Sequence, residues 1–125
     1  MALRKIETWA LDRILKSDDV FREYVEGDLV FRQGDPGDFM AVVMRGSVVI
    51  RRADRDLAVI DAGSVFGEMA LIDGEPRSAD AVARAHTRVA IIDERHFKAL
   101  VRDTPDFSLM IMKILVERLR ANLES

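Results

Sequence analysis

One loop of the sequence carries residue types that can hold a sugar phosphate. Glu68 and Arg77 lie nine positions apart, Ser78 follows directly, and Gly67 precedes Glu68. The planar guanidinium of an arginine fits two phosphate oxygens, and a carboxylate accepts a hydrogen bond from a ribose hydroxyl. Gly67 lets the backbone approach a ligand, and the free N–H groups of a short helical turn over residues 68–71 attract an anion. The pattern favours a small anionic site over the alternative, a surface turn in which Arg77 and Glu68 pair and bind nothing.

Short apolar segments separated by turns must position this loop. All seven glycines fall in or beside these turns, where positive φ angles are often required. Such an arrangement is typical of a roll or barrel, and it differs from alternating βαβ units. We therefore predict strands over residues 20–25, 29–32, 39–45, 47–52, 57–61, 79–83 and 88–93.

Helical spacing flanks the strands at both ends of the chain. Residues 3–16 carry apolar side chains at spacings of three and four, which is typical of a short amphipathic helix. Asp93 can cap a short helix, and Thr104 can cap a last helix that begins at Pro105 and runs to about Leu123. The expected fold is mainly β with flanking α: an antiparallel β-roll of the jelly-roll type with one N-terminal helix and two C-terminal helices.

The chain length fits one domain over residues 1–125. Within it we expect the N-terminal helix in residues 1–18, the roll in 19–93 and the C-terminal helices in 94–125. The loop with the candidate site covers residues 66–80.

Composition and charge exclude several function classes. The net charge of −3 provides no basic field for a polyanion, so we expect no nucleic-acid partner. No cysteine is present, which excludes disulfides and thiolate metal sites and fits a reducing cytoplasm. The apolar runs are far shorter than the roughly 20 residues of a membrane span, and the start of the chain lacks the apolar core of a secretory signal. We expect a cytoplasmic protein.

The last helix carries two apolar stripes on roughly opposite sides. One stripe can pack on the roll, and the other then needs a ligand, a partner helix or a neighbouring domain. We therefore expect a homodimer or an effector domain to contact this helix; the alternative is a helix buried on most of its surface. The first stripe is Phe107, Ile111 and Ile114, and the second is Leu109, Met112, Val116, Leu119 and Leu123.

Two short motifs in the loop carry a family resemblance. Residues 66–71 read Phe-Gly-Glu-Met-Ala-Leu, and residues 76–79 read Pro-Arg-Ser-Ala. With these motifs the sequence closely resembles the cyclic nucleotide-binding domain family. Members of that family include regulatory subunits of cyclic-AMP-dependent kinase, the catabolite activator protein and bacterial cyclic-nucleotide-gated channels. The resemblance covers residues 20–123 and implies a sensor for a cyclic nucleotide, with cyclic AMP preferred to cyclic GMP, whose binding moves the C-terminal helix.

The resemblance also implies roles for single residues. Glu68 binds the ribose 2′-hydroxyl, and Arg77 binds the exocyclic phosphate oxygens. Ser78 and the backbone amides of Gly67 and Ala70 complete the phosphate site. We expect the side chain of Arg77 to bind an anion and to contribute little to the fold itself. The ligand-free Arg77→Ala variant should therefore be almost as stable as the ligand-free parent.

Other ligand-binding positions follow from the same resemblance. Met69 and Ala79 belong to the site, and Arg118, Leu119 and Arg120 are candidates for the lid over the base. An arginine among them can stack on a purine.

Two departures from the family pattern concern the end of the loop and the end of the chain. Asp80 stands where threonine is frequent, and its charge is harmless if the side chain points away from the pocket. The activator protein continues beyond the position of Ser125 into a DNA-binding domain, and we expect no such output domain here.

Rival functions are less well supported by the residues. His86 and His96 are the only histidines and form no close pair, so we expect no metal site and no cofactor. No serine has a histidine and a carboxylate in a catalytic pattern, and the metal clusters of a cyclic phosphodiesterase are missing, so we expect no enzyme. The leading rival is a degenerate domain that binds no nucleotide and serves for dimerisation or docking; Glu68 and Arg77 argue against it.

Overall fold

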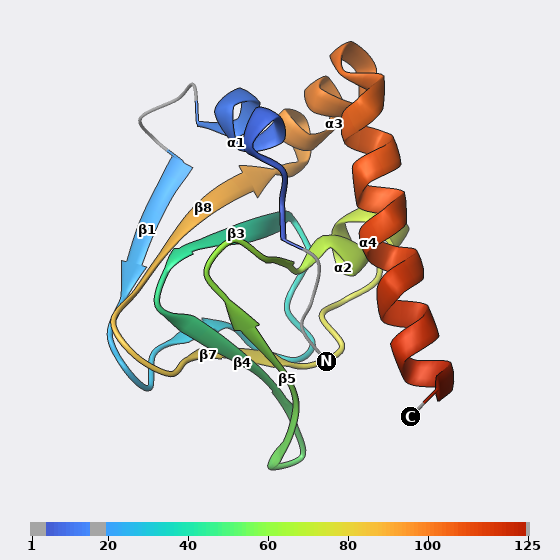
Figure 1. Ribbon diagram of the computed structural model, residues 1–125. Helices are drawn as coiled ribbons and strands as arrows, with labels where there is room; N and C mark the ends of the chain where they lie inside the picture. Colours follow the sequence, from blue (N-terminus) through green and yellow to red (C-terminus); the bar gives the residue numbers. More distant parts are fainter. Residues whose placement is uncertain (1–4, 16–19, 125) are drawn as a thin grey trace.

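A computed structural model describes residues 5–15 and 20–124 of the chain, with side chains as far as Ala121. Four helices and eight strands make up this described part (Figure 1). The helices are α1 (Thr8–Ile14), α2 (Glu68–Asp73), α3 (Glu94–Asp103) and α4 (Pro105–Glu124). The strands are β1 (Phe21–Tyr24), β2 (Leu29–Phe31), β3 (Phe39–Arg45), β4 (Ser47–Arg52), β5 (Arg55–Asp61), β6 (Val65–Phe66), β7 (Asp80–Ala83) and β8 (Thr87–Asp93).

The strands form two antiparallel sheets that face one another as a roll. One sheet has the order β1-β8-β3-β6, and the other has the order β2-β7-β4-β5. Every pairing is antiparallel, and neighbours such as β3 and β8 lie far apart in sequence. The predicted fold, an antiparallel β-roll with a helix before it and helices after it, is confirmed.

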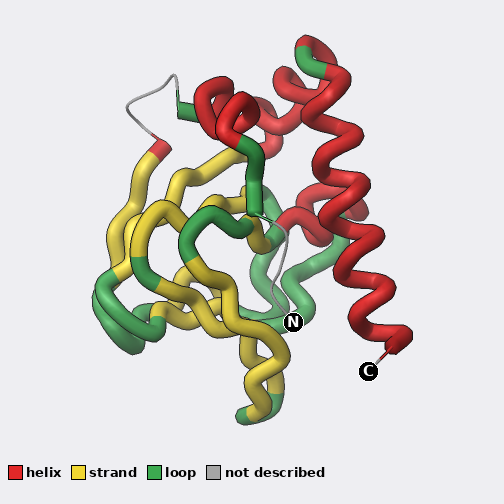
Figure 2. Tube along the Cα trace, viewed as in Figure 1, coloured by secondary structure: helices red, strands yellow, loops and turns green. Residues whose placement is uncertain are grey.

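Two apolar clusters stabilise this architecture. One lies between the two sheets and fills the roll, and the other lies between the β1-β8-β3-β6 sheet and the helices. Figure 2 shows helix α4 packed along one side of the strands. The second cluster therefore contains side chains from the helices and from the strands of the roll. Apolar burial of this kind contributes about 25 cal/mol for each Å² removed from water. The inner cluster is Val30, Phe31, Ala41, Val43, Val48, Ile60, Phe66, Ala81, Val89 and Ile91.

Helix α4 contacts the rest of the protein with one face only. Phe107, Ile111 and Ile114 are buried against the roll together with Met110, which confirms that the first stripe packs inward. In the second stripe Leu109, Met112, Val116 and Leu119 are 50%, 59%, 47% and 61% exposed, and the side chain of Leu123 lies outside the described residues. The alternative of a helix buried on most of its surface is therefore wrong. None of the described helices is long and apolar enough to cross a membrane.

The differences from the predicted elements have local causes. Strand β6 has only two residues, too few for an alternating pattern, and was absent from the predicted strands. Strand β5 begins at Arg55 because a two-residue turn, Ala53 and Asp54, reverses the chain with φ angles of 51° and 62°. The predicted cap of α3 is confirmed, since the Asp93 carboxylate accepts a hydrogen bond of 2.8 Å from the backbone N–H of His96. The predicted helix over residues 3–16 is present at Thr8–Ile14, and residues 1–4 and 16–19 lie outside the described part.

Candidate ligand-binding site

A cavity of about 560 Å³ opens between the β4–β5 hairpin, the 66–80 loop and the C-terminal half of α4. Its volume falls within the usual range of about 300–1,000 Å³ for small-molecule sites. All eight residues predicted to bind a ligand line this cavity: Gly67, Glu68, Met69, Ala70, Arg77, Ser78, Ala79 and Arg118. The structure therefore brings together residues that are up to 51 positions apart in the sequence.

Glu68 is the first residue of α2 and is only 1% exposed. The turn before it depends on Gly67, whose φ of +80° is left-handed. A Cβ added to Gly67 would lie only 2.8 Å from Nη1 of Arg77, so the absence of a side chain leaves room for the guanidinium. One carboxylate oxygen of Glu68, Oε1, accepts a hydrogen bond from Nη1 of Arg118. The other oxygen, Oε2, is buried and has no partner. This buried carboxylate therefore has one acceptor that no donor of the described residues uses.

Arg77 is 3% exposed and holds the loop to the roll. Its Nη1 donates a 2.8 Å hydrogen bond to the carbonyl of Gly67, and its Nη2 donates to the carbonyl of Phe39. The guanidinium also lies over the rings of Phe31 and Phe39, 4.0 Å and 4.7 Å from their centroids. The expectation that Arg77 supports little of the empty fold is wrong, because hydrogen bonds from a charged group and cation–π contacts both stabilise it.

Burial lowers the pKa of the Arg77 guanidinium from its ordinary value. The carboxylates of Asp38, Glu68 and Asp35 act in the opposite direction. Because the ordinary pKa of an arginine lies far above neutrality, the side chain remains a cation at neutral pH. The cavity thus contains a permanent positive charge that is largely shielded from water.

Arg118 connects α4 to the loop. Besides its ion pair with Glu68, its Nη2 donates a hydrogen bond to the carbonyl of Val65. Of the three predicted lid residues only Arg118 lines the cavity. Leu119 is 61% exposed, and Arg120 is also exposed. These two residues lie on the outward side of the helix, away from the cavity.

Three polar atoms of this cavity are buried without a hydrogen-bond partner. They are Oε2 of Glu68, Nε of Arg77 and Nε of Arg118, and only one other such side-chain atom, Oγ of Ser47, occurs in the described residues. Most buried polar groups in proteins are hydrogen-bonded, and leaving one unpaired costs about 1–3 kcal/mol. Three residues that line the cavity thus carry one acceptor and two N–H donors that no other described residue satisfies.

The remaining loop residues surround this cluster. Ser78 is exposed at the mouth of the cavity. Asp80 points elsewhere, because its Oδ1 accepts a 2.7 Å hydrogen bond from the backbone N–H of Gln33. Its negative charge therefore does not occupy the phosphate position. Gly37 packs directly on α2: a Cβ added to it would lie 2.2 Å from the Cβ of Ala70.

Sequence reasoning missed the wall of the cavity opposite the loop. That wall comes from β4 and β5 and is mostly apolar, with one arginine, Arg52, at its edge. Ile50 pairs with Ala58, and both pack against the cluster inside the roll, so they lie on the face of the hairpin that looks into the cavity. The strand pattern was visible in the sequence, but nothing in it marked which face of the hairpin opens onto a cavity. The full wall is Ile50, Arg52, Leu57, Ala58, Val59 and Ile60.

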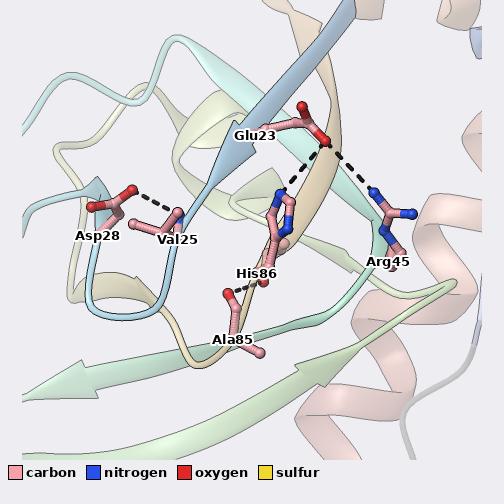
Figure 3. Close-up of polar contacts among 7 residues, drawn as sticks. Glu23, Val25, Asp28, Arg45, Ala85 and His86 are labelled. Carbon is pink, nitrogen blue, oxygen red and sulfur yellow. Dashed lines mark hydrogen bonds and ion pairs between the residues drawn. The ribbon is translucent and has the colours of Figure 1, made fainter.

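The histidines lie away from this cavity, since neither lines it. Figure 3 shows His86 and Arg45 directed toward the same carboxylate, that of Glu23, and each nitrogen lies 3.7 Å from Oε1. All three side chains are exposed, so this cluster is a surface ion-pair group that contributes little stability. In the described residues no group of three or more histidines and carboxylates could hold a metal ion.

Comparison with known proteins adds a family match. Residues 21–104 match the family model described as the cyclic nucleotide-binding domain. The cyclic AMP receptor protein of Thermus thermophilus is 37% identical over 109 residues, which cover 82% of this chain and 50% of the relative. A cyclic nucleotide-gated potassium channel of Mesorhizobium japonicum is 36% identical over 92 residues, covering 74% of this chain and 25% of the channel. The chain spans about half the length of the first curated relatives it matches.

Solved structures show the same architecture. The catabolite activator protein of Thermus thermophilus superposes with a TM-score of 0.82 at 32% identity, covering 95% of this chain and 58% of that one. The EAL enzyme Bd1971 in its cAMP-bound form gives a TM-score of 0.62 at 30% identity, covering 83% of this chain and 29% of the enzyme.

Proposed function

Because the chain belongs to the cyclic nucleotide-binding domain family, we propose that it binds cyclic AMP in the 560 Å³ cavity and acts as a sensor. The observation that carries this proposal is the set of unpaired polar atoms described above: Oε2 of Glu68 and the Nε atoms of Arg77 and Arg118. A cyclic nucleotide offers one hydroxyl donor and one anionic phosphate, which complement these atoms in number and type.

The phosphate fits beside Arg77. Its guanidinium is the one buried cation of the 66–80 loop, and its Nε is directed at no protein acceptor. Gly67 allows Nη1 of Arg77 to lie close to the start of α2, because a Cβ at this position would come within 2.8 Å of that nitrogen. Hydrogen bonds between a guanidinium and a phosphate are charge-assisted and about twice as strong as neutral ones.

The ribose and the base fit the other two sides of the cavity. The ribose 2′-hydroxyl can donate to Oε2 of Glu68, which has no other partner. The base then lies on the apolar wall of the hairpin, where Ile50 and Ala58 offer side chains that a planar ring can cover. Covering them removes apolar surface from water and adds affinity without directional bonds.

The Glu68–Arg118 ion pair supports a link between ligand binding and α4. Ligand contact with Glu68 changes the surroundings of the carboxylate that Arg118 holds. A shift of Glu68 therefore acts on α4, provided that the ligand has different affinities for the two positions of the helix. The second stripe of α4 is exposed, so a chain that binds this stripe would respond to such a movement.

We further propose that this stripe contacts the same stripe of a second copy. Leu109, Met112, Val116 and Leu119 follow one another at spacings of three, four and three, which is the seam of a two-helix coiled coil. A symmetric contact of this kind uses one surface twice and needs no second protein.

The proposal treats the domain as a binding module without catalytic activity of its own. The cavity contains one carboxylate, one serine and no histidine, so no nucleophile is paired with a base there. The enzymatic neighbour Bd1971 matches over 29% of its length only. The lack of cysteine fits a reducing compartment such as the cytoplasm.

Calorimetric titration of the purified chain with cyclic AMP tests this function. We expect saturable binding of one nucleotide per chain, together with unchanged cyclic AMP after prolonged incubation. Extraction of the purified protein with acid, followed by chromatography, shows whether nucleotide copurifies and masks the titration. If folded protein whose extract contains no nucleotide shows no heat of binding and no thermal stabilisation by millimolar cyclic AMP, the domain is a docking module instead.

A further inference from the structure

We infer that the guanidinium of Arg52 binds the edge of the base and allows the site to accept a guanine nucleotide as well as cyclic AMP. This inference rests on the proposed function and assigns a role to a residue outside the 66–80 loop. Arg52 is one of three arginines that line the cavity, and the other two, Arg77 and Arg118, already hold backbone carbonyls.

The hairpin fixes the position of Arg52. It is the last residue of β4, and the turn of Ala53 and Asp54 brings Arg55 directly opposite it. Non-glycine residues with positive φ are uncommon, and two in succession define the tight turn that matches the twist of a hairpin. Arg52 therefore extends from a short, well-defined turn at the mouth of the cavity.

The side chain of Arg52 faces the cavity and its neighbour does not. Arg52 shares a strand face with Ile50, which also lines the cavity, because side chains alternate along a strand. Arg51 lies on the opposite face and pairs with Asp56, with 2.8 Å between Nε and Oδ1. The contact of Arg52 with protein is weak: Nη1 lies 3.4 Å from the carbonyl of Ser78, near the limit for a hydrogen bond. A better acceptor can therefore recruit this guanidinium.

The base of a bound cyclic nucleotide lies within reach of Arg52. Arg77 locates the phosphate and Glu68 locates the ribose, so the base extends along the β4–β5 wall. Ser78, whose carbonyl Arg52 now contacts, directly follows Arg77, so the guanidinium of Arg52 lies close to the loop that would hold the phosphate.

The chemistry of arginine decides which base it favours. A guanidinium only donates hydrogen bonds. Guanine presents two adjacent acceptors, O6 and N7, and an arginine can bind both at once. Adenine presents N7 beside an amino group that is itself a donor, so the same side chain finds one acceptor and one repelling partner. A good bidentate pair of this kind discriminates against the wrong base by roughly 10-fold to 100-fold.

A comparison of two arginine variants with three ligands tests the inference. Titrations with cyclic AMP, cyclic GMP and cyclic IMP are made on the parent, Arg52→Ala and the matched control Arg55→Ala. Arg55 is an exposed arginine of the same turn that does not line the cavity, so its removal changes the net charge equally. Cyclic IMP has O6 and N7 but lacks the guanine amino group, which separates recognition by Arg52 from recognition by the Ser78 hydroxyl.

We expect Arg52→Ala to weaken cyclic GMP and cyclic IMP by about tenfold or more and cyclic AMP by less than about threefold. Arg52→Lys, which keeps the charge but not the planar fork, should fall between parent and alanine variant. Arg55→Ala should leave all three affinities unchanged. Equal losses for all three ligands, or an unchanged affinity for cyclic GMP, would overturn the inference and leave the proposed function standing. A parent that binds none of the three ligands overturns the proposed function itself.

Discussion

The carboxylate of Glu68, at the start of α2, pairs with the guanidinium of Arg118, in the second half of α4, across 50 positions of the chain. The side chain of Glu68 is 1% exposed and that of Arg118 is 19% exposed, so the pair is largely shielded from water. This contact joins the nucleotide cavity to the helix whose outer stripe is exposed.

Arg118→Ala is expected to destabilise the empty domain, because Glu68 then keeps a buried charge without its partner. An unsatisfied buried group costs about 1–3 kcal/mol, which corresponds to a fall in melting temperature of roughly 4–10 °C for a domain of this size. Thermal unfolding of the ligand-free variant and parent measures this fall in melting temperature. The control is Arg120→Ala, two positions along the helix and exposed, which should melt with the parent. Coincident melting of all three proteins would show that the ion pair does not contribute.

Arg77→Ala is expected to lose both ligand affinity and stability. Truncating one partner of a buried charged pair costs about 2–5 kcal/mol in binding, or roughly 30-fold to several thousand-fold. Glu68→Ala should cost less, about 1.5–3 kcal/mol, because a ribose hydroxyl is neutral. Loss of the contacts of Arg77 with the carbonyls of Gly67 and Phe39 should also lower the melting temperature without ligand.

Titration and melting of Arg77→Ala beside Arg55→Ala separate these effects. Arg55→Ala, on the exposed hairpin turn, controls for the loss of one positive charge. Binding of cyclic AMP within about threefold of the parent, in a normally folded Arg77→Ala, would place the phosphate elsewhere.

Cyclic AMP is expected to bind at least as tightly as cyclic GMP. The family resemblance implies this preference, and Arg52 favours guanine from the exposed mouth of the cavity only. A competition assay with a fluorescent cyclic nucleotide gives the ratio of the two affinities. The prediction fails if cyclic GMP is preferred by tenfold or more, which is about 1.4 kcal/mol.

Leu119→Glu is expected to abolish self-association through α4. A charge in the centre of an apolar seam loses its hydration when two helices pack, which disfavours the dimer. Analytical ultracentrifugation over a concentration series, with and without cyclic AMP, measures the equilibrium. Lys113→Glu is the matched control, since Lys113 is exposed on α4 outside the stripe. A parent that sediments as a strict monomer at all concentrations would remove the second copy as the partner of this stripe.

Gly37→Ala is expected to displace α2 and weaken ligand binding. The added methyl would lie 2.2 Å from the Cβ of Ala70 and 3.0 Å from its carbonyl carbon, so the loop or the helix must move. Overpacking of this kind typically costs about 1–3 kcal/mol. Titration and melting of Gly37→Ala measure the loss, and the double variant Gly37→Ala/Ala70→Gly, which removes the closest clash, should recover part of it. No change in either measurement would show that this contact tolerates a methyl group.

The sequence predicted the fold well where turn residues bound each strand. The limits of β3 and β4 agree with the predicted segments 39–45 and 47–52, because Gly46 forces the turn between them. The site residues of the 66–80 loop were predictable because their two motifs lie close together, between Phe66 and Ala79. Arg52 and Leu57 were not, since their place in the cavity depends on how the β4–β5 hairpin curves over the loop, which arises only in the folded chain.

The double use of Arg77 changes what this residue signifies in related chains. Its guanidinium supports the empty fold through the carbonyls of Gly67 and Phe39, so a domain that ceased to bind nucleotide would still lose stability by replacing it. Arginine in this position therefore marks the architecture as much as the ligand. Ser78 and Arg52 are exposed and make only one weak contact with each other, so substitutions at these two positions should have little effect on the fold. Divergence of ligand preference among relatives is to be sought at those two positions first.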